Sequence, residues 1–171
     1  MQAYLLARHD PECASLAQRF RVMVFLATPH KGSDLAGTLN NILRASIIHG
    51  TRPYLGNIER NSEALEVIND EFRHYAAHLK LCSLYETKKT KSPLSGAVMV
   101  VEKDSAVLGY PGEQVVMMNA NHRDICKFDD MSDPNFVTVS NVIGTMVDSL
   151  SKLGANFQFL CLLRATLKEQ P

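Results

Sequence analysis

The most constraining feature of the sequence is an uninterrupted apolar run, Val22 to Ala27, which reads VMVFLA. Its residues are mostly β-formers, and the polar segment 28–32 (TPHKG) closes it. A strand without polar alternation is typical of a sheet covered on both faces, as in the parallel sheets of α/β proteins. The run therefore predicts an α/β fold built on a parallel sheet.

Three further short apolar runs extend this pattern along the chain. They are Leu81–Tyr85, Ala97–Val101 and Val115–Met118, and each is followed by polar residues. Alternation of such runs with helical segments is the signature of α/β architecture. We therefore expect a short parallel sheet of about three to four strands flanked by helices.

Caps and apolar spacing predict the helices. Three of them cover Gln2–Ala7, 12–19 and Ser62–Leu79. Another is capped by Ser33 or Asp34 and has its apolar face at Leu35, Leu39, Ile42 and Leu43. The last begins at Asp133-Pro134 and ends at Gly154. A loop is expected over 46–61, because Gly50, Pro53 and Gly56 fall there.

Composition excludes several classes of protein. The 171 residues suit one globular unit, and 18 basic against 18 acidic residues give no net charge. This balance argues against nucleic-acid binding, which needs clustered excess Lys and Arg. No apolar run approaches the ~20 residues of a transmembrane helix. Four widely spaced cysteines predict free, mostly buried thiols in a reducing compartment, hence a cytoplasmic location.

Chemistry-bearing residues are expected at the carboxyl ends of the strands, where ligands gather in open parallel sheets. Glu86 follows the second predicted strand, and His122 follows a later one. An acid and then a histidine is the order in which α/β-hydrolases complete the Ser, acid, His triad. On spacing alone, a solvated carboxylate at a strand end is the favoured interpretation of Glu86.

Four local motifs make the comparison more specific. They are ATPHKGS at 27–33, SLYET at 83–87, VVEKDSAVLG at 100–109 and NHRDICKF at 121–128. Together, over residues 2–150, they resemble the lipase-like α/β-hydrolase domain of the serine active site-containing protein family, related to GPI inositol-deacylase-like lipases. The version found at the N-terminus of fungal NACHT and ankyrin-repeat proteins is the most similar. The resemblance implies an ester or lipid substrate.

The resemblance also implies roles for individual residues. It makes His122 the catalytic histidine and Glu86 the acid, with Asp104 as the alternative acid and Glu102 as a weaker candidate. It places an active-site loop at Thr28, Pro29, His30, Gly32 and Ser33. His30 is expected to bond nearby backbone rather than to act as the base.

The nucleophile is the missing component. No serine of the chain lies in a G-x-S-x-G elbow, and Gln2–Ala7 resembles the later part of the helix that follows this elbow. We therefore expect residues 1–153 to be the C-terminal half of an α/β-hydrolase domain, with an atypical tail at 154–171. The nucleophile would lie about half a dozen residues before Met1. A truncated serine hydrolase of this kind should be inactive.

Other functions remain open at this point. The domain could serve as a non-catalytic interaction or signalling module of a NACHT-type protein, and the apolar strand Val22–Ala27 could self-associate through an open edge. Neither a metal nor a cofactor is expected. His74 and His78 stand one helical turn apart without a third ligand, so they fit a helix surface pair better than a metal site. Cys126 is expected to be a buried structural thiol.

Overall fold

The computed structural model describes residues 1–30, 58–92 and 96–168, and their side chains over 1–30, 65–91 and 96–152. The helix predicted after Ser33 or Asp34 lies outside the described residues, as does most of the loop predicted over 46–61.

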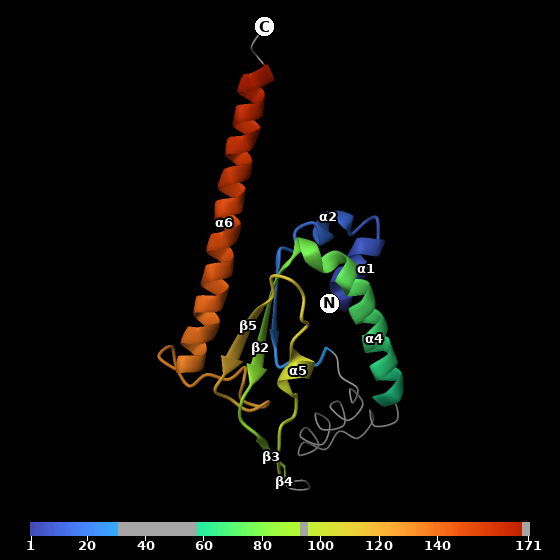
Figure 1. Ribbon diagram of the computed structural model, residues 1–171, viewed down its shortest axis with the longest axis vertical. Helices are drawn as coiled ribbons and strands as arrows, with labels where there is room; N and C mark the ends of the chain where they lie inside the picture. The colour runs from blue at the N-terminus through green and yellow to red at the C-terminus, as the bar shows by residue number, and fades with distance from the viewer. Residues whose placement is uncertain (31–57, 93–95, 169–171) are drawn as a thin grey trace.

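A three-stranded parallel sheet forms the centre of the fold (Figure 1). Its strands are β1 (Val22–Leu26), β2 (Lys80–Glu86) and β5 (Gln114–Met118), in the order β1-β2-β5. Both pairings are parallel. The predicted α/β class and short parallel sheet are confirmed, and three of the four predicted apolar runs supply its strands.

The prediction of a further sheet strand over Ala97–Val101 is wrong. Only Gly96–Val98 is extended, as β4, and it pairs antiparallel with β3 (Thr90–Ser92) in a separate hairpin. Gly96 adopts a φ of 70°, a left-handed conformation that side chains disfavour. Val100 and Val101 then leave the strand and pack, fully buried, with Ala106. Their apolar character therefore reflects burial against α5 and Tyr85 of β2.

Helices cover the two faces of the sheet. On one face, Tyr4 and Leu5 of α1 (Gln2–His9) pack with Phe72 of α4 (Ile58–Tyr75) against Leu81 of β2. On the other face, α6 (Pro134–Lys168) packs against β1, β2 and β5 through a second cluster that includes Met146. Figure 1 shows α6 and the α1–α4 pair on opposite sides of the sheet.

Helix boundaries depart from the prediction at several points. The second helix, α2, is only Ala14–Ala17; α4 begins already at Ile58 and continues into a 3-10 turn, η3 (Ala76–His78); and α5 is a single turn, Lys103–Ala106. The predicted helix end at Gly154 is wrong, since α6 runs on to Lys168. An interior glycine costs a helix only about 1 kcal/mol, which favourable neighbours can offset.

The start of α6 agrees with the prediction. The Asp133 carboxylate accepts the backbone N–H of Asn135 at 2.7 Å, and Pro134 occupies the first helical position. The Asp133 carboxylate satisfies one of the N–H groups that a helix start leaves unpaired, and Pro134 removes another because it has no N–H. Within the described residues, none of the helices combines the length and apolar content needed to cross a bilayer.

Candidate functional site

The carboxyl ends of β2 and β5 bring the predicted acid and the predicted histidine together. Glu86 is the last residue of β2 and lies in register with Met118, the last residue of β5. Because the strands are parallel, the loop after β5 begins beside Glu86. Glu86 Oε1 lies 3.7 Å from Nδ1 of His122. Residues 36 positions apart in sequence therefore meet at one edge of the sheet.

Backbone hydrogen bonds hold the two strand ends in this position. The N–H groups of Thr87 and Lys88 both donate to the carbonyl oxygen of Ala120, at 3.2 and 3.0 Å. The Thr87 hydroxyl donates to the carbonyl oxygen of Met118 at 2.8 Å. These bonds join the segment after Glu86 to the segment before His122, so they fix the separation of the two backbone positions from which the side chains extend.

Asn121 shapes the turn that carries His122. Its Oδ1 accepts the backbone N–H groups of Arg123 at 2.9 Å and Asp124 at 3.2 Å, and its Nδ2 donates to Asp124 Oδ2 at 2.7 Å. Its carbonyl oxygen accepts the N–H of Ile125. An asparagine that bonds its own backbone two residues on forms an Asx turn. This turn fixes the backbone on both sides of the histidine.

The Glu86 side chain is fully buried, whereas the His122 side chain is 22% exposed. Glu86 Oε1 accepts the backbone N–H of Val101 at 2.5 Å. Among the described residues, neither Glu86 Oε2 nor His122 Nδ1 has a hydrogen-bond partner, and both atoms are buried. A buried unpaired acceptor costs about 1–3 kcal/mol. A small movement of the imidazole would let Nδ1–H donate to this carboxylate, and such bonds are often long in unliganded sites.

The two competing acids are located differently. Glu102 and Asp104 are both exposed, at the N-cap and in the first turn of α5. Across the described part of the chain, the carboxylate within ion-pair distance of His122 is that of Glu86. The geometry therefore brings together Glu86 and His122, and leaves Asp104 in solvent.

The loop after β1 contributes Thr28, Pro29 and His30 to the same edge of the sheet, while Gly32 and Ser33 lie outside the described residues. His30 is only 3% exposed, and its ring packs edge-on against Phe25 with centroids 4.5 Å apart. Its backbone N–H donates to Ser105 at 2.8 Å, and its carbonyl oxygen accepts from Asn69. These contacts tie the loop to α4 and α5.

Two other sequence candidates lie at the surface. Cys126 is exposed, which contradicts the expected buried thiol. The turn after His122 directs Ile125 into the core instead, leaving its neighbour outside. His74 of α4 and His78 of η3 are both exposed. In the described ranges, no three His, Cys, Asp or Glu side chains are grouped closely enough to hold a metal ion.

Sequence reasoning missed Glu113, which organises the loop before β5. Its carboxylate accepts N–H groups of Leu108 at 3.0 Å, Gly109 at 2.6 Å and Tyr110 at 3.3 Å. It also accepts the hydroxyl of Ser83, a fully buried residue of β2, at 2.5 Å. The sequence signal is an acid that follows a Gly-Tyr-Pro-Gly turn, where successive N–H groups need an acceptor.

Fold and site together define a partial α/β protein with a carboxylate–histidine pair at the carboxyl edge of its sheet. Among curated proteins, the chain is similar to Protein SERAC1 of Bos taurus, with 30% identity over 125 residues. It is similar to Protein SERAC1 of Mus musculus at 29% identity over the same length. Each match covers 72% of this chain but only 18% of the relative.

The chain therefore spans less than a fifth of the length of these relatives. No family model matches the chain, so the fungal NACHT-associated version stays a prediction. No solved structure matches it either.

Proposed function

We propose that this chain supplies the acid–histidine half of an ester- or lipid-cleaving serine hydrolase of the α/β type. His122 is the general base, and Glu86 is the acid that orients it. The observation that carries the proposal is the buried Glu86 carboxylate 3.7 Å from His122 Nδ1, at the strand ends where such sites form. The similarity to Protein SERAC1 and the four motifs support it.

The chemistry follows from which ring nitrogen faces the acid. With Nδ1 turned toward Glu86, the neutral imidazole carries its proton on Nδ1 and leaves Nε2 free as the base. Nε2 then takes the proton of a serine hydroxyl as this attacks the ester carbonyl, and later returns it to the leaving alcohol. The Glu86 carboxylate fixes this tautomer and stabilises the imidazolium that forms. Burial of Glu86 strengthens this electrostatic effect, because water screens it less.

The serine itself is not in a recognisable elbow anywhere in the 171 residues. We therefore expect this chain, assayed alone with p-nitrophenyl esters, to hydrolyse them no faster than buffer does. Hydrolysis that His122→Ala abolishes would show that a nucleophile is present after all. Background hydrolysis that is unchanged in His122→Ala agrees with the proposal.

The acid–histidine pair can be tested without turnover. Nitrogen-15 NMR of the His122 ring should show the proton of the neutral form on Nδ1. Glu86→Ala should move that proton toward Nε2, because the acceptor is gone. Asp104→Ala is the matched control, since Asp104 is exposed, and it should leave the tautomer unchanged. A response to Asp104→Ala and not to Glu86→Ala would transfer the acid role to Asp104.

A second function, a non-catalytic interaction module, is favoured by a different observation. The described sheet has an edge strand, β1, whose five residues are all half-buried beside an apolar groove. Such an edge is suited to binding another chain. The tautomer measurement separates the two functions, because a binding module does not require the Nδ1 proton to be held toward Glu86.

A further inference from the structure

The loop between β5 and α6 that carries the histidine is attached to α6 at both of its ends. We call residues 119–128 the histidine loop. At its beginning, the Asn119 N–H donates to Oδ1 of Asn135 at 3.1 Å, and Nδ2 of Asn135 donates to the carbonyl oxygen of Asn119 at 3.3 Å. At its end, the ring of Phe128 packs edge-on against that of Phe136, with centroids 5.6 Å apart. Two adjacent residues in the first turn of α6 therefore hold both ends of this loop.

The Asn135 side chain bonds Asn119 as a neighbouring strand would. Backbone groups of successive residues in a strand point to alternate sides. The carbonyl oxygen of Ala120 faces β2, where it accepts the N–H groups of Thr87 and Lys88. Both backbone groups of Asn119 instead meet the amide of Asn135, which accepts through its oxygen and donates through its nitrogen. The backbone that leads to the histidine is thus held from β2 and from α6.

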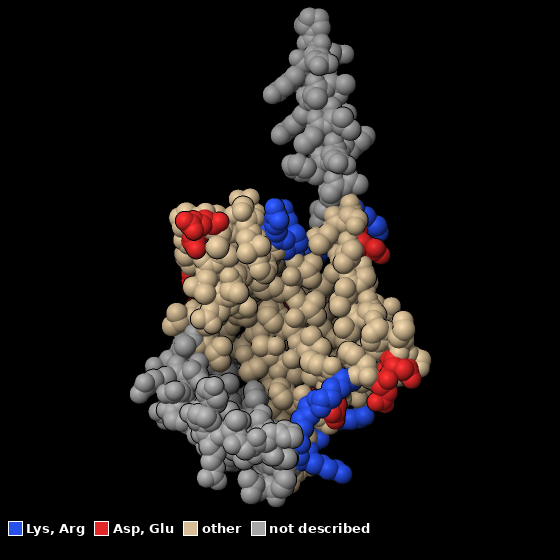
Figure 2. Space-filling model, turned by 180° about the vertical axis from the view of Figure 1, so that it is seen from behind, with Lys and Arg blue, Asp and Glu red and all other residues tan. Residues whose placement is uncertain are grey.

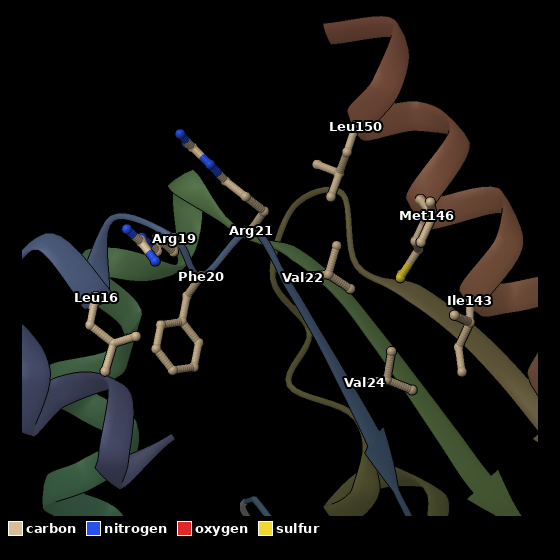
Figure 3. Close-up of a pocket in the computed structure, with 10 residues that line it drawn as sticks. Leu16, Arg19, Phe20, Arg21, Val22, Val24, Ile143, Met146 and Leu150 are labelled. Atoms are coloured by element: carbon tan, nitrogen blue, oxygen red, sulfur yellow. The ribbon is translucent and has the colours of Figure 1, made fainter. Parts of the chain in front are cut away.

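The contacts that α6 makes beyond its first turns are apolar. Met146 lies in the same core cluster as Ile125 of the histidine loop. Ile143, Met146 and Leu150 lie across an apolar groove of about 520 Å³ from β1 (Figure 3). Seen from behind, the face between α6 and the α1–α2 side is almost free of charged side chains, with basic side chains at its upper rim (Figure 2). Apolar packing has no preferred direction, whereas hydrogen bonds have one, so the Asn135 amide orients the histidine loop against α6.

We propose that Asn135 is a positioning residue for His122, and that its amide keeps the imidazole beside Glu86. This inference rests on the proposed function, because it assigns a role within the same acid–histidine pair. Glu86 Oε1 and His122 Nδ1 are 3.7 Å apart, and a side-chain hydrogen bond is lost beyond about 3.5 Å. A small shift of the loop backbone therefore decides whether the Nδ1 proton can reach the carboxylate. Without the Asn135 amide, hydrogen bonds from β2 would restrain that backbone from one side only.

The test is nitrogen-15 NMR of the His122 ring in the full 171-residue chain. Asn135→Ala should shift and broaden the ring signals and lower the ratio of the Nδ1–H to the Nε2–H form. We expect a change of at least about twofold, because an equilibrium that depends on one hydrogen bond changes about two- to tenfold when the bond is lost. Glu86→Ala gives the change for complete loss of the acid. Thr138→Ala is the matched control: its hydroxyl donates to the Pro134 carbonyl oxygen within α6, at 2.7 Å, and its loss should leave the ring signals unchanged.

Asn135→Asp separates positioning from helix stability. It keeps an acceptor for the Asn119 N–H, and an acid in the first turn stabilises a helix, but it removes the Nδ2 donor. This variant should unfold at about the wild-type temperature and still move the His122 ring signals in the direction of Asn135→Ala, by a smaller amount. Wild-type ring signals in Asn135→Asp beside altered ones in Asn135→Ala would attribute the effect to the stability of α6 and overturn the proposal. Equal changes in Asn135→Ala and Thr138→Ala would overturn it too.

The location of the ring proton distinguishes a failure of this inference from a failure of the proposed function. A tautomer that ignores Glu86→Ala contradicts the proposed function, and the shift and broadening in Asn135→Ala then still decide whether Asn135 holds the histidine. A tautomer that responds to Glu86→Ala but not to Asn135→Ala overturns the role of Asn135 alone and leaves the acid–histidine pair in place.

Discussion

Strands β1 and β2 have similar sequences but different environments. Both are largely apolar, VMVFL and KLCSLYE, and they pair in register. All five residues of β1 are half-buried, whereas five of the seven in β2 are buried. β2 has a strand on each side and β1 has one neighbour among the described residues. An apolar run therefore identifies a strand, while the number of neighbours decides how far it is buried.

The same contrast extends to the strand ends. Glu86, at the end of β2, is held in two ways. Its carboxylate accepts the Val101 N–H, and the N–H groups of Thr87 and Lys88, which follow it, donate to the carbonyl oxygen of Ala120. Ala27 at the end of β1 leaves the strand with a φ of 43°, a left-handed conformation uncommon for alanine. The candidate site thus lies at the better-anchored end of the sheet, and the apolar groove lies along its less covered edge.

The largest expected effect compares two leucines that face each other in register, Leu84 of β2 and Leu26 of β1. Leu84 is 0% exposed, so Leu84→Ala should lower the free energy of unfolding by about 2–5 kcal/mol. Leu26 is half-buried, and Leu26→Ala should cost about 1–2 kcal/mol, since less area is lost from the core. Urea denaturation measures both. Equal losses would show that β1 is as buried in solution as β2.

The next effect concerns the anchoring of Glu86. Glu86→Ala leaves the buried N–H of Val101 without its acceptor, at an expected cost of about 1–3 kcal/mol. Glu86→Gln keeps an acceptor oxygen in place and should recover most of that loss. Thermal unfolding of both variants distinguishes the two. A glutamine variant as unstable as the alanine variant would mean that the charge of Glu86, rather than its hydrogen bond, stabilises the fold.

The strand β1 and the start of α6 could be predicted from the sequence, whereas the position of the run AVMVV and the role of Glu113 could not. The run VMVFLA predicted β1, and Asp133-Pro134 predicted the start of α6, because strand burial and helix caps are local signals. The run AVMVV was mistaken for a sheet strand, because burial of Val100 and Val101 against α5 produces the same apolar composition as a central strand. Three donors to Glu113 lie only three to five residues before it, but the fourth, the Ser83 hydroxyl, reaches it only because β2 pairs with β5.

The candidate site was likewise only partly predictable. The family resemblance indicated Glu86 and His122, but their meeting depends on β2 and β5 being neighbours, which no local sequence pattern specifies. Cys126 was expected inside because cysteine is usually buried. Its exposure follows from the direction of a turn set by Asn121, and a one-residue rotation of that turn would exchange it with Ile125.

A smaller effect is expected from the turn that carries His122. Asn121→Ala removes the acceptor for the N–H groups of Arg123 and Asp124, with an expected loss of about 1 kcal/mol, as for a lost helix cap. Asn121→Asp keeps the acceptor and should lose less. The His122 ring resonances should also shift and broaden in the alanine variant. Unchanged resonances would mean that the hydrogen bonds of Thr87 and Lys88 to Ala120 are enough to position the histidine.

The smallest effect compares position 82 of β2 with position 24 of β1, which face each other in register. Burial raises the pKa of the Cys82 thiol to about 11, with a contribution from the negative charge of Glu113. Cys82 should therefore alkylate far more slowly at pH 8 than a cysteine introduced by Val24→Cys on the half-buried edge, and more slowly than exposed Cys126. Mass spectrometry after a timed iodoacetamide pulse gives the order.

The same shift sets the sign of a pH dependence. The ordinary pKa of the thiol is 9.0, so in the unfolded chain it ionises before it does in the folded one. Its contribution to stability is complete below pH 9 and is lost as the pH rises toward 11. Cys82→Ala should flatten this part of the stability curve relative to wild type, and Cys126→Ala should not. Identical curves for wild type and Cys82→Ala would mean that β2 opens to solvent as readily as the edge beside it.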